Sequence, residues 1–147
     1  MATCMTEPAP PFVLSLDIGT SSVRAELYDR TGRGVPGVGA ALAHAPETTP
    51  DGGVEMEPEG LVEAACWALT SALAQAGPRA AEIAAVGVST FWHSVLGVDE
   101  AGRPTIPVIM WADTRSVREV ETLRRTLDEG AVHARTGCAI PLSSCPL

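Results

Sequence analysis

A short polar segment separates two apolar runs near the N-terminus. Asp17 lies near the end of the run FVLSLDI, and four residues suited to an anion follow it: Gly19, Thr20, Ser21 and Ser22. Glycine lets the backbone approach a phosphate closely, and amide and hydroxyl groups donate to it. A carboxylate at the end of a buried strand can hold Mg²⁺, which takes one or two carboxylates together with phosphate oxygens. The segment is a candidate phosphate and metal site.

Arg24 extends this candidate site. In a strand it shares a face with Ser22, so its guanidinium can reach the same anion. All ten basic residues of the chain are arginines, so the chain has no lysine for a phosphate-binding loop or a general base. A phosphate must therefore be bound by backbone amides, hydroxyls, arginine or a metal ion. Asp, Gly, Thr and Ser also favour turns on backbone grounds alone. The segment by itself leaves a structural turn and a phosphate site equally open.

A second group of polar and aromatic residues follows the run IAAVGVS. Trp92 and His93 come just after it, and Asp113 and Arg115 come after the later run VIMW. An indole stacks on the C–H faces of a sugar, while imidazole, carboxylate and guanidinium pair with hydroxyls. Simpler alternatives are a core position for Trp92, a turn role for His93 and a helix N-cap for Asp113.

The elements expected to position these residues form an α/β pattern. Apolar and alternating runs predict strands over residues 12–18, 22–29, 34–44 and 83–89, with a loop over 44–53. Residues 58–76 predict a helix that begins with proline and ends at a Gly-Pro pair. Its inward face is predicted to carry Leu61, Ala65, Leu69 and Leu73. The strand at 83–89 is predicted to run parallel to the first one and to be buried on both faces.

The second half of the chain predicts a hairpin and one more helix. Asp99 and Gly102 repeat the turn spacing of Asp29 and Gly32, which places a hairpin over residues 94–111. A helix is expected over 114–129, begun by Asp113 or Thr114 and ended by Gly130. Its inward residues are predicted to be Val117, Val120 and Leu127. Residues 1–11 are expected to be a mobile leader, and the tail from Thr136 an irregular one.

Composition narrows the class of partner. The 147 residues carry a net charge of −8, which disfavours nucleic acid and anionic membranes, because both require clustered basic residues. No signal peptide and no membrane-length apolar run is evident, so a cytoplasmic protein is expected. The four cysteines lack a C-x-x-C pair and are expected to be reduced thiols: Cys4, Cys66, Cys138 and Cys145.

Together the two polar segments resemble the amino-terminal part of the FGGY carbohydrate kinases, in the actin, Hsp70 and sugar kinase superfamily. LDIGTSSVRAELYDRTG is similar to the family's first phosphate motif, and GVSTFWHSVLGVDEAGRP with VIMWADTRS to its sugar-binding segment. The resemblance also covers Glu55 to Pro58 and the Thr136-Gly137 pair. It implies an incomplete ribonuclease H-like α/β domain over residues 12–147.

The resemblance implies a role for each candidate residue. Asp17 becomes the metal-linked acid, and the nucleotide phosphates are implied to lie against Gly19, Thr20, Ser21, Ser22 and Arg24. The Trp92-His93 pair falls where xylulose and gluconate kinases carry Met-His, and where glycerol kinases carry an Arg-Glu pair that this chain lacks. Asp113 falls where the family binds sugar hydroxyls, and Arg115 is a candidate partner for an aldonate carboxylate.

The implied activity is transfer of the γ-phosphoryl of ATP, with Mg²⁺, to a sugar or aldonate hydroxyl. HSVLGVDE and WADTRS look most like the gluconate kinases, with xylulose kinases next. The family's general base is expected beyond Leu147, so little activity is expected from these residues alone. An unfinished sheet is expected to expose an edge that favours self-association. The alternative is a non-catalytic module of the same superfamily that binds nucleotide or a partner.

Overall fold

The computed structural model describes residues 7–138 and 140, and these belong to two compact units. Unit 1 takes its described residues from 1–45 and 59–91, and unit 2 from 46–58 and 92–147. The candidate phosphate residues lie in unit 1, and the candidate sugar residues lie in unit 2.

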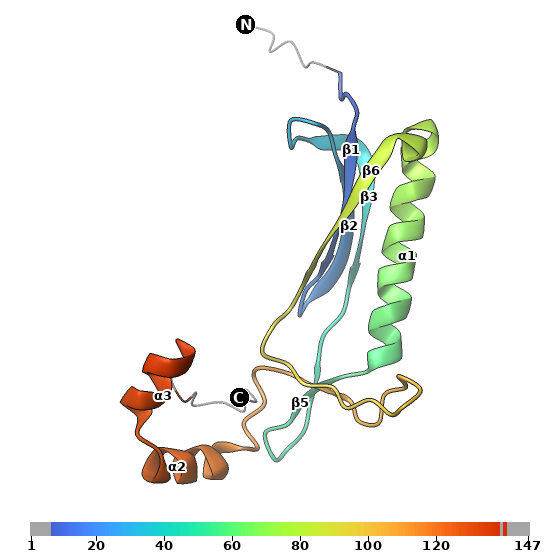
Figure 1. Ribbon diagram of the computed structural model, residues 1–147. Coiled ribbons are helices and arrows are strands. Elements are labelled where there is room, and N and C mark those ends of the chain that lie inside the picture. The colour runs from blue at the N-terminus through green and yellow to red at the C-terminus, as the bar shows by residue number, and fades with distance from the viewer. Residues whose placement is uncertain (1–6, 139, 141–147) are drawn as a thin grey trace, which may run out of the picture. The chain divides into compact units, whose positions relative to one another are not determined.

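Unit 1 is built on a four-stranded mixed sheet (Figure 1). The strands are β1 (Phe12–Ile18), β2 (Ser22–Tyr28), β3 (Gly34–Ala43) and β6 (Ile83–Thr90), in the order β3-β2-β1-β6. β1 pairs antiparallel with β2, and β2 with β3, whereas β6 runs parallel to β1. The predicted meander, helix and parallel strand are confirmed, and the mixed α/β order fits an incomplete ribonuclease H-like domain.

Helix α1 (Pro58–Ala76) packs on one face of this sheet and continues into the 3₁₀ helix η1 (Gly77–Glu82). The helix has the predicted bounds, but its buried face differs from the predicted one. An alanine stripe at four-residue spacing is buried: Ala64, Ala68, Ala72 and Ala76. Ala65 and Leu69 are partly buried beside that stripe, and Leu73 is 39% exposed. Small side chains let the helix axis approach the sheet, and this contact decides which stripe faces inward.

Strand β6 is the edge strand of the described sheet, so its predicted burial on both faces is wrong. Residues 84–90 are all exposed, and Val86 and Val88 are 55% and 62% exposed. β6 pairs with β1 on one side, and within the described part of the chain no strand pairs with its other side. Its composition is as apolar as that of a strand buried on both faces, although its residues are exposed in the described structure.

Unit 2 contains a small antiparallel sheet of short strands. They are β4 (Glu47–Thr48), β5 (Val54–Met56) and β7 (Val108–Ile109), in the order β4-β5-β7. β4 lies inside the stretch predicted to be a loop, which is wrong for those two residues. The predicted hairpin over 94–111 is confirmed by antiparallel bridges from Val95 to Ile109 and from Val98 to Pro104. At its turn the Asp99 carboxylate accepts from the amides of Ala101 and Arg103 at 2.9 Å.

The predicted helix over 114–129 is two helices, α2 (Val117–Thr126) and α3 (Glu129–Thr136). The break follows from Asp128, whose side chain caps α3 by accepting from the Ala131 amide at 3.2 Å, while Leu127 has extended backbone angles. Gly130 therefore lies in the first turn of α3 instead of ending a helix. Val120 is buried as predicted, but Val117 and Leu127 are 39% and 44% exposed.

The chain ends are described only in part. Residues 1–6, with Cys4, lie outside the described residues, and so do 139 and 141–147, with Cys145. In the remainder of the predicted leader, the Ala9 carbonyl accepts from the Arg30 amide at 3.2 Å. In the predicted irregular tail, Ile140 is buried and its carbonyl accepts from Arg124 at 2.7 Å. Cys66 and Cys138 are free thiols. None of the described helices has the length and apolar character needed to span a membrane.

Candidate functional site

The corner between β1 and β2 is closed by backbone hydrogen bonds. The Gly19 amide donates to the Ser22 carbonyl at 2.9 Å, and the His44 amide donates to the Ser21 carbonyl at 3.0 Å. The His44 ring places Nε2 2.8 Å from the Gly19 carbonyl oxygen. A Cβ on Gly19 would lie 3.1 Å from the Ser22 carbonyl oxygen, so glycine suits this tight corner. The corner is therefore held by a hydrogen bond between β1 and β2 and by contacts from His44, which follows β3.

Asp17 lies on the polar face of the sheet, opposite Arg24 on β2 and Ser89 on β6. The Arg24 Nε donates to the Ser22 hydroxyl at 3.0 Å. Within the described residues, no hydrogen bond or ion pair reaches the Asp17 carboxylate. An acid that served only to close the turn would be bonded to backbone amides of that turn, as Asp29 is bonded to the Thr31 and Arg33 amides. Asp17 therefore remains open to water or a metal ion.

Thr20 and Ser21 supply the donors of the corner. Among the described residues, neither their amides nor their hydroxyls have a protein partner. Adjacent amides and hydroxyls beside a free carboxylate suit a phosphate carried with Mg²⁺, because that ion needs few protein ligands. The described residues contain no group of three or more His, Cys, Asp or Glu side chains that could hold a metal ion.

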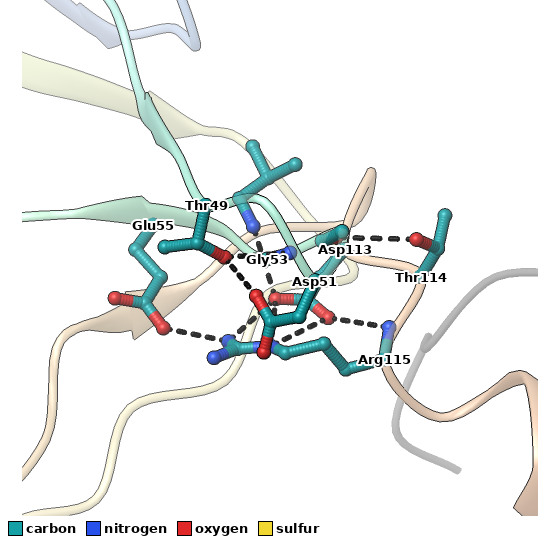
Figure 2. Close-up of polar contacts among 9 residues, drawn as sticks. Thr49, Asp51, Gly53, Glu55, Asp113, Thr114 and Arg115 are labelled. Carbon is teal, nitrogen blue, oxygen red and sulfur yellow. Dashed lines mark hydrogen bonds and ion pairs between the residues drawn. The ribbon is translucent and has the colours of Figure 1, made fainter.

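In unit 2, Asp113 and Arg115 bind each other (Figure 2). Asp113 is 1% exposed, and its Oδ2 accepts from Arg115 Nη2 at 2.6 Å and from the Val54 amide at 3.1 Å. The other oxygen accepts from the Arg115 amide at 3.0 Å and from its Nε at 3.2 Å. Arg115 Nη2 also lies 2.6 Å from Glu55 Oε1, so one guanidinium joins two carboxylates. The cluster ties β5 to the segment after β7.

These contacts hold both Asp113 and Arg115 charged. Burial alone would raise the pKa of Asp113, but hydrogen bonds from the Arg115 side chain and from the Arg115 and Val54 amides lower it to about 2. Hydrogen bonds to Asp113 first, and then to Glu55, raise the pKa of Arg115. Asp113 is thus not a helix N-cap, since Ser116 precedes α2. Its carboxylate is already bonded to the protein from several directions.

The turn between β4 and β5 packs against the same segment. Thr49 donates to the Asp51 carboxylate and accepts from the Gly53 amide, and Thr114 donates to the Gly52 carbonyl through its amide at 3.0 Å and its hydroxyl at 3.2 Å (Figure 2). Gly52 has φ +94°, and a Cβ there would collide with the Thr114 hydroxyl. Glycine at this position therefore allows the turn to close on Thr114.

Trp92 and His93 lie at the open end of the 94–111 hairpin. Trp92 is 78% exposed, so it is not a core residue within the described part of the chain, and its ring centroid lies 4.4 Å from that of His93. His93 has φ +58°, a left-handed backbone that is uncommon and costly for a non-glycine residue, and strained residues of this kind cluster at functional sites. The Ser94 hydroxyl contacts the Met110 sulfur at 3.9 Å, so the hairpin brings the Trp92 and Asp113 segments to the same end.

Comparison with known proteins matches residues 12–144 to the FGGY family of carbohydrate kinases, N-terminal domain. The chain belongs to this family. It is 34% identical over 128 residues to a glycerol kinase of Citrifermentans bemidjiense, which covers 86% of this chain and 25% of the relative. It is 32% identical over 130 residues to the gluconokinase of Bacillus subtilis, covering 88% of this chain and 24% of the relative.

The crystal structure of a xylulose kinase from Rhodospirillum rubrum matches with a TM-score of 0.82 and 26% identity, over 90% of this chain and 27% of that one. This likeness confirms the sugar kinase fold that the sequence predicted. The chain spans about a quarter of the length of these FGGY relatives.

The sequence indicated the candidate site residues, which remain predictions, but it did not indicate the residues that support them. His44, which holds the corner at Gly19, was predicted only as part of a loop. The sequence indicated Glu55 only as part of a Glu-x-x-Pro motif, and its pairing with Arg115 was not predicted. An acid alternating with apolar residues in VEM is the signal that a short strand points Glu55 away from the core.

Proposed function

We propose that this chain supplies the phosphate-binding corner and the sugar-binding segment of an ATP-dependent carbohydrate kinase of the cytoplasm. The observation that carries the proposal is the Asp17 carboxylate, which has no protein partner in the described residues and lies at the carboxyl end of β1. After Ile18 and Gly19 come Thr20 and Ser21, whose amides and hydroxyls have no protein partner among the described residues. A carboxylate and free donors in one corner suit a metal-bound phosphate better than a structural turn.

Each group has a chemical task in this proposal. The Thr20 and Ser21 donors and the Arg24 guanidinium would bind phosphate oxygens, with Arg24 kept near Ser22 by its hydrogen bond. Mg²⁺ held through Asp17 would neutralise phosphate charge as the phosphoryl group moves. The exposed Trp92 face would stack on the sugar, and His93 would bind a hydroxyl. Phosphoryl transfer is accelerated mainly by positioning the acceptor hydroxyl in line with the phosphoryl group and by neutralising charge.

The proposed substrate is a small sugar or sugar acid. Segments 93–100 and 111–116 look most like those of the gluconate kinases and next like those of the xylulose kinases, so gluconate is the first candidate substrate and xylulose the second. Glycerol is disfavoured, because the chain lacks the Arg-Glu pair that glycerol kinases carry where it has Trp92-His93. Overall identity does not separate these substrates, because the glycerol kinase and gluconokinase relatives are 34% and 32% identical.

Phosphotransfer requires more than these residues in our proposal. The chain corresponds to about a quarter of its relatives, and the expected general base lies beyond Leu147. Little or no kinase turnover is therefore expected from the 147 residues alone. The alternative, a non-catalytic nucleotide- or partner-binding module, gives no reason for an exposed Trp92 beside a strained His93.

The genomic DNA beyond codon 147 offers the first test. A continuation, in frame or shifted, that encodes the remaining parts of a kinase supports the proposal, and its absence supports the non-catalytic module.

The protein encoded by the joined reading frames should phosphorylate a sugar or sugar acid with ATP. Asp17→Asn should lower kcat by about 100-fold or more, as expected for a group that acts on transition-state charge. Asp29→Asn is the matched control, because Asp29 is bonded within its own turn. Failure to phosphorylate any compound of a sugar and aldonate panel contradicts the proposal.

A further inference from the structure

The β1–β2 corner lacks the hydrogen bond that commonly closes a tight turn. The Gly19 amide donates to the Ser22 carbonyl at 2.9 Å, but among the described residues the Ser22 amide returns no bond to the Gly19 carbonyl. In the turn after β2, by contrast, the Gly32 amide donates to the Asp29 carbonyl at 2.9 Å. The partner of the Gly19 carbonyl is the His44 ring, whose Nε2 lies 2.8 Å from the oxygen. A bond from outside the turn therefore takes the place of the local closing bond.

The ring bond fixes the direction of the next backbone amide. A carbonyl oxygen only accepts hydrogen bonds, so His44 Nε2 must carry the hydrogen. The peptide group between Gly19 and Thr20 is trans, and the C=O and N–H of a planar trans peptide point in opposite directions. The bond from His44 therefore turns the Thr20 N–H away from the imidazole. Because this amide has no protein partner among the described residues, it is available to a ligand.

His44 fixes a second peptide group in the same way. Its own backbone amide donates to the Ser21 carbonyl at 3.0 Å, so the Ser22 N–H at the other end of that peptide also points away from His44. Carbonyl oxygens repel an anion, whereas N–H groups attract it. By engaging the Gly19 and Ser21 carbonyls, His44 turns two oxygens away from the side on which the Thr20 amide is free.

Glycine at the corner makes such a restraint necessary. A Cβ at position 19 would lie 3.1 Å from the Ser22 carbonyl oxygen, so the tight corner favours glycine. The same absence of a Cβ allows the peptide after Gly19 to rotate at low cost. A rotated peptide would present its carbonyl oxygen where the Thr20 N–H now lies. His44 is well placed to prevent this rotation, because it follows directly on β3, whose last residue, Ala43, pairs with Ser22 of β2.

We propose that His44 is a positioning residue for phosphate binding, whose Nε2–H holds the Gly19–Thr20 peptide in the orientation that presents the Thr20 amide to a nucleotide phosphate. This inference rests on the proposed function of the corner. His44 acts through the peptide group, so it is not a catalytic residue. Its task is to donate a hydrogen bond, and Nε2 carries a hydrogen both in one neutral tautomer and in the cation. A different side chain that donates from the same place can therefore replace it.

Two substitutions separate this donor from the bulk of the ring. His44→Gln keeps an N–H donor near the place of Nε2, whereas His44→Leu fills similar space and donates nothing. His133→Leu is the matched control, because it removes an exposed ring on α3 that has no hydrogen bond among the described residues. In each form of the 147-residue chain, the residual dipolar coupling of the Thr20 N–H reports the direction of this amide. Isothermal titration calorimetry with ATP and Mg²⁺ gives the Kd.

The Thr20 coupling should fit the direction in the structure for the unmodified chain and for His44→Gln. In His44→Leu it should depart from that direction, while the couplings of β1 and β2 stay unchanged. His44→Leu should weaken nucleotide binding about tenfold, because an aligned donor to a charged oxygen is lost. His44→Gln and His133→Leu should both bind within about twofold of the unmodified chain.

An unchanged Thr20 coupling in His44→Leu, or undiminished nucleotide binding by that variant, overturns the inference and leaves the proposed function intact. Equal weakening in His44→Gln and His44→Leu also overturns it, because the donor would then not be what matters. A ring ¹⁵N spectrum of the unmodified chain in which His44 Nε2 carries no hydrogen overturns it even if His44→Leu does not fold. No binding of ATP and Mg²⁺ by the unmodified chain contradicts the proposed function as well.

Discussion

Asp17 and Arg24 are cross-strand neighbours of opposite charge, yet they do not form an ion pair in the described structure. Arg24 donates instead to Ser22 at 3.0 Å, within its own strand. A cross-strand ion pair at a sheet surface contributes little stability, so its absence costs the fold little. Its absence leaves a carboxylate and a guanidinium available to a bound metal and phosphate at the same end of the sheet.

The Asp113 carboxylate should make stability fall in acid. The pKa of Asp113 is about 2 in the folded chain against an ordinary value of 3.8, so the contribution is present above about pH 4 and is lost as pH falls toward 2. The shift corresponds to about 2 kcal/mol. Asp113→Asn should therefore be less stable than the unmodified chain by about that amount at pH 6, measured by urea unfolding. The gap should close between pH 4 and pH 2, and a gap that stays constant over this range would refute the assignment.

The alanine stripe of α1 should tolerate no larger side chain. Ala68 is fully buried against the sheet, so Ala68→Leu should lower the free energy of unfolding by about 1–3 kcal/mol through overpacking. Leu73→Ala, on the predicted but incorrect face, is the control and should cost less, because Leu73 is 39% exposed. Chemical denaturation of both variants measures the difference. A larger loss for Leu73→Ala would show that the leucine stripe faces the core.

The outer edge of β6 should promote self-association. β6 carries no charged residue, and its outer edge, which no described strand pairs with, offers backbone groups to another copy. Sedimentation velocity of the 147-residue chain should show mass rising with concentration, and Val88→Lys should reduce this rise. Val62→Lys on α1 is the control, because Val62 and Val88 are 63% and 62% exposed. Equal effects of the two lysines would argue against pairing through β6.

The strands of unit 1 and the bounds of α1 could be predicted because local patterns decide them. Alternation identifies β2, and Pro58 with the Gly77-Pro78 pair delimits the helix. The inward face of α1 could not be predicted, because apolar residues lie on every side of the helix. Only contact with the sheet determines that the alanine stripe is the buried one. The split of α2 from α3 depended on one capping residue, Asp128, inside an otherwise continuous helical pattern.

The sequence could predict which residue types the candidate site contains, but not which of these residues contact each other. Asp17 and the hydroxyls of the corner are adjacent in sequence, so their proximity follows from the turn itself. The cluster at Arg115 joins residues sixty positions apart, and no local pattern pairs Glu55 with Arg115. The pairing therefore emerges only from the fold.

We propose that the β1–β2 corner binds a metal-bound phosphate through Asp17. The most direct test is a ¹⁵N–¹H NMR titration of the 147-residue chain with Mg²⁺ and ATP. We predict that the amide signals of Gly19, Thr20, Ser21 and Ser22 shift in a saturable way, and that Asp17→Asn removes the part that depends on Mg²⁺. Shifts confined to other residues, or the same Mg²⁺-dependent shifts in Asp17→Asn, would contradict the claim.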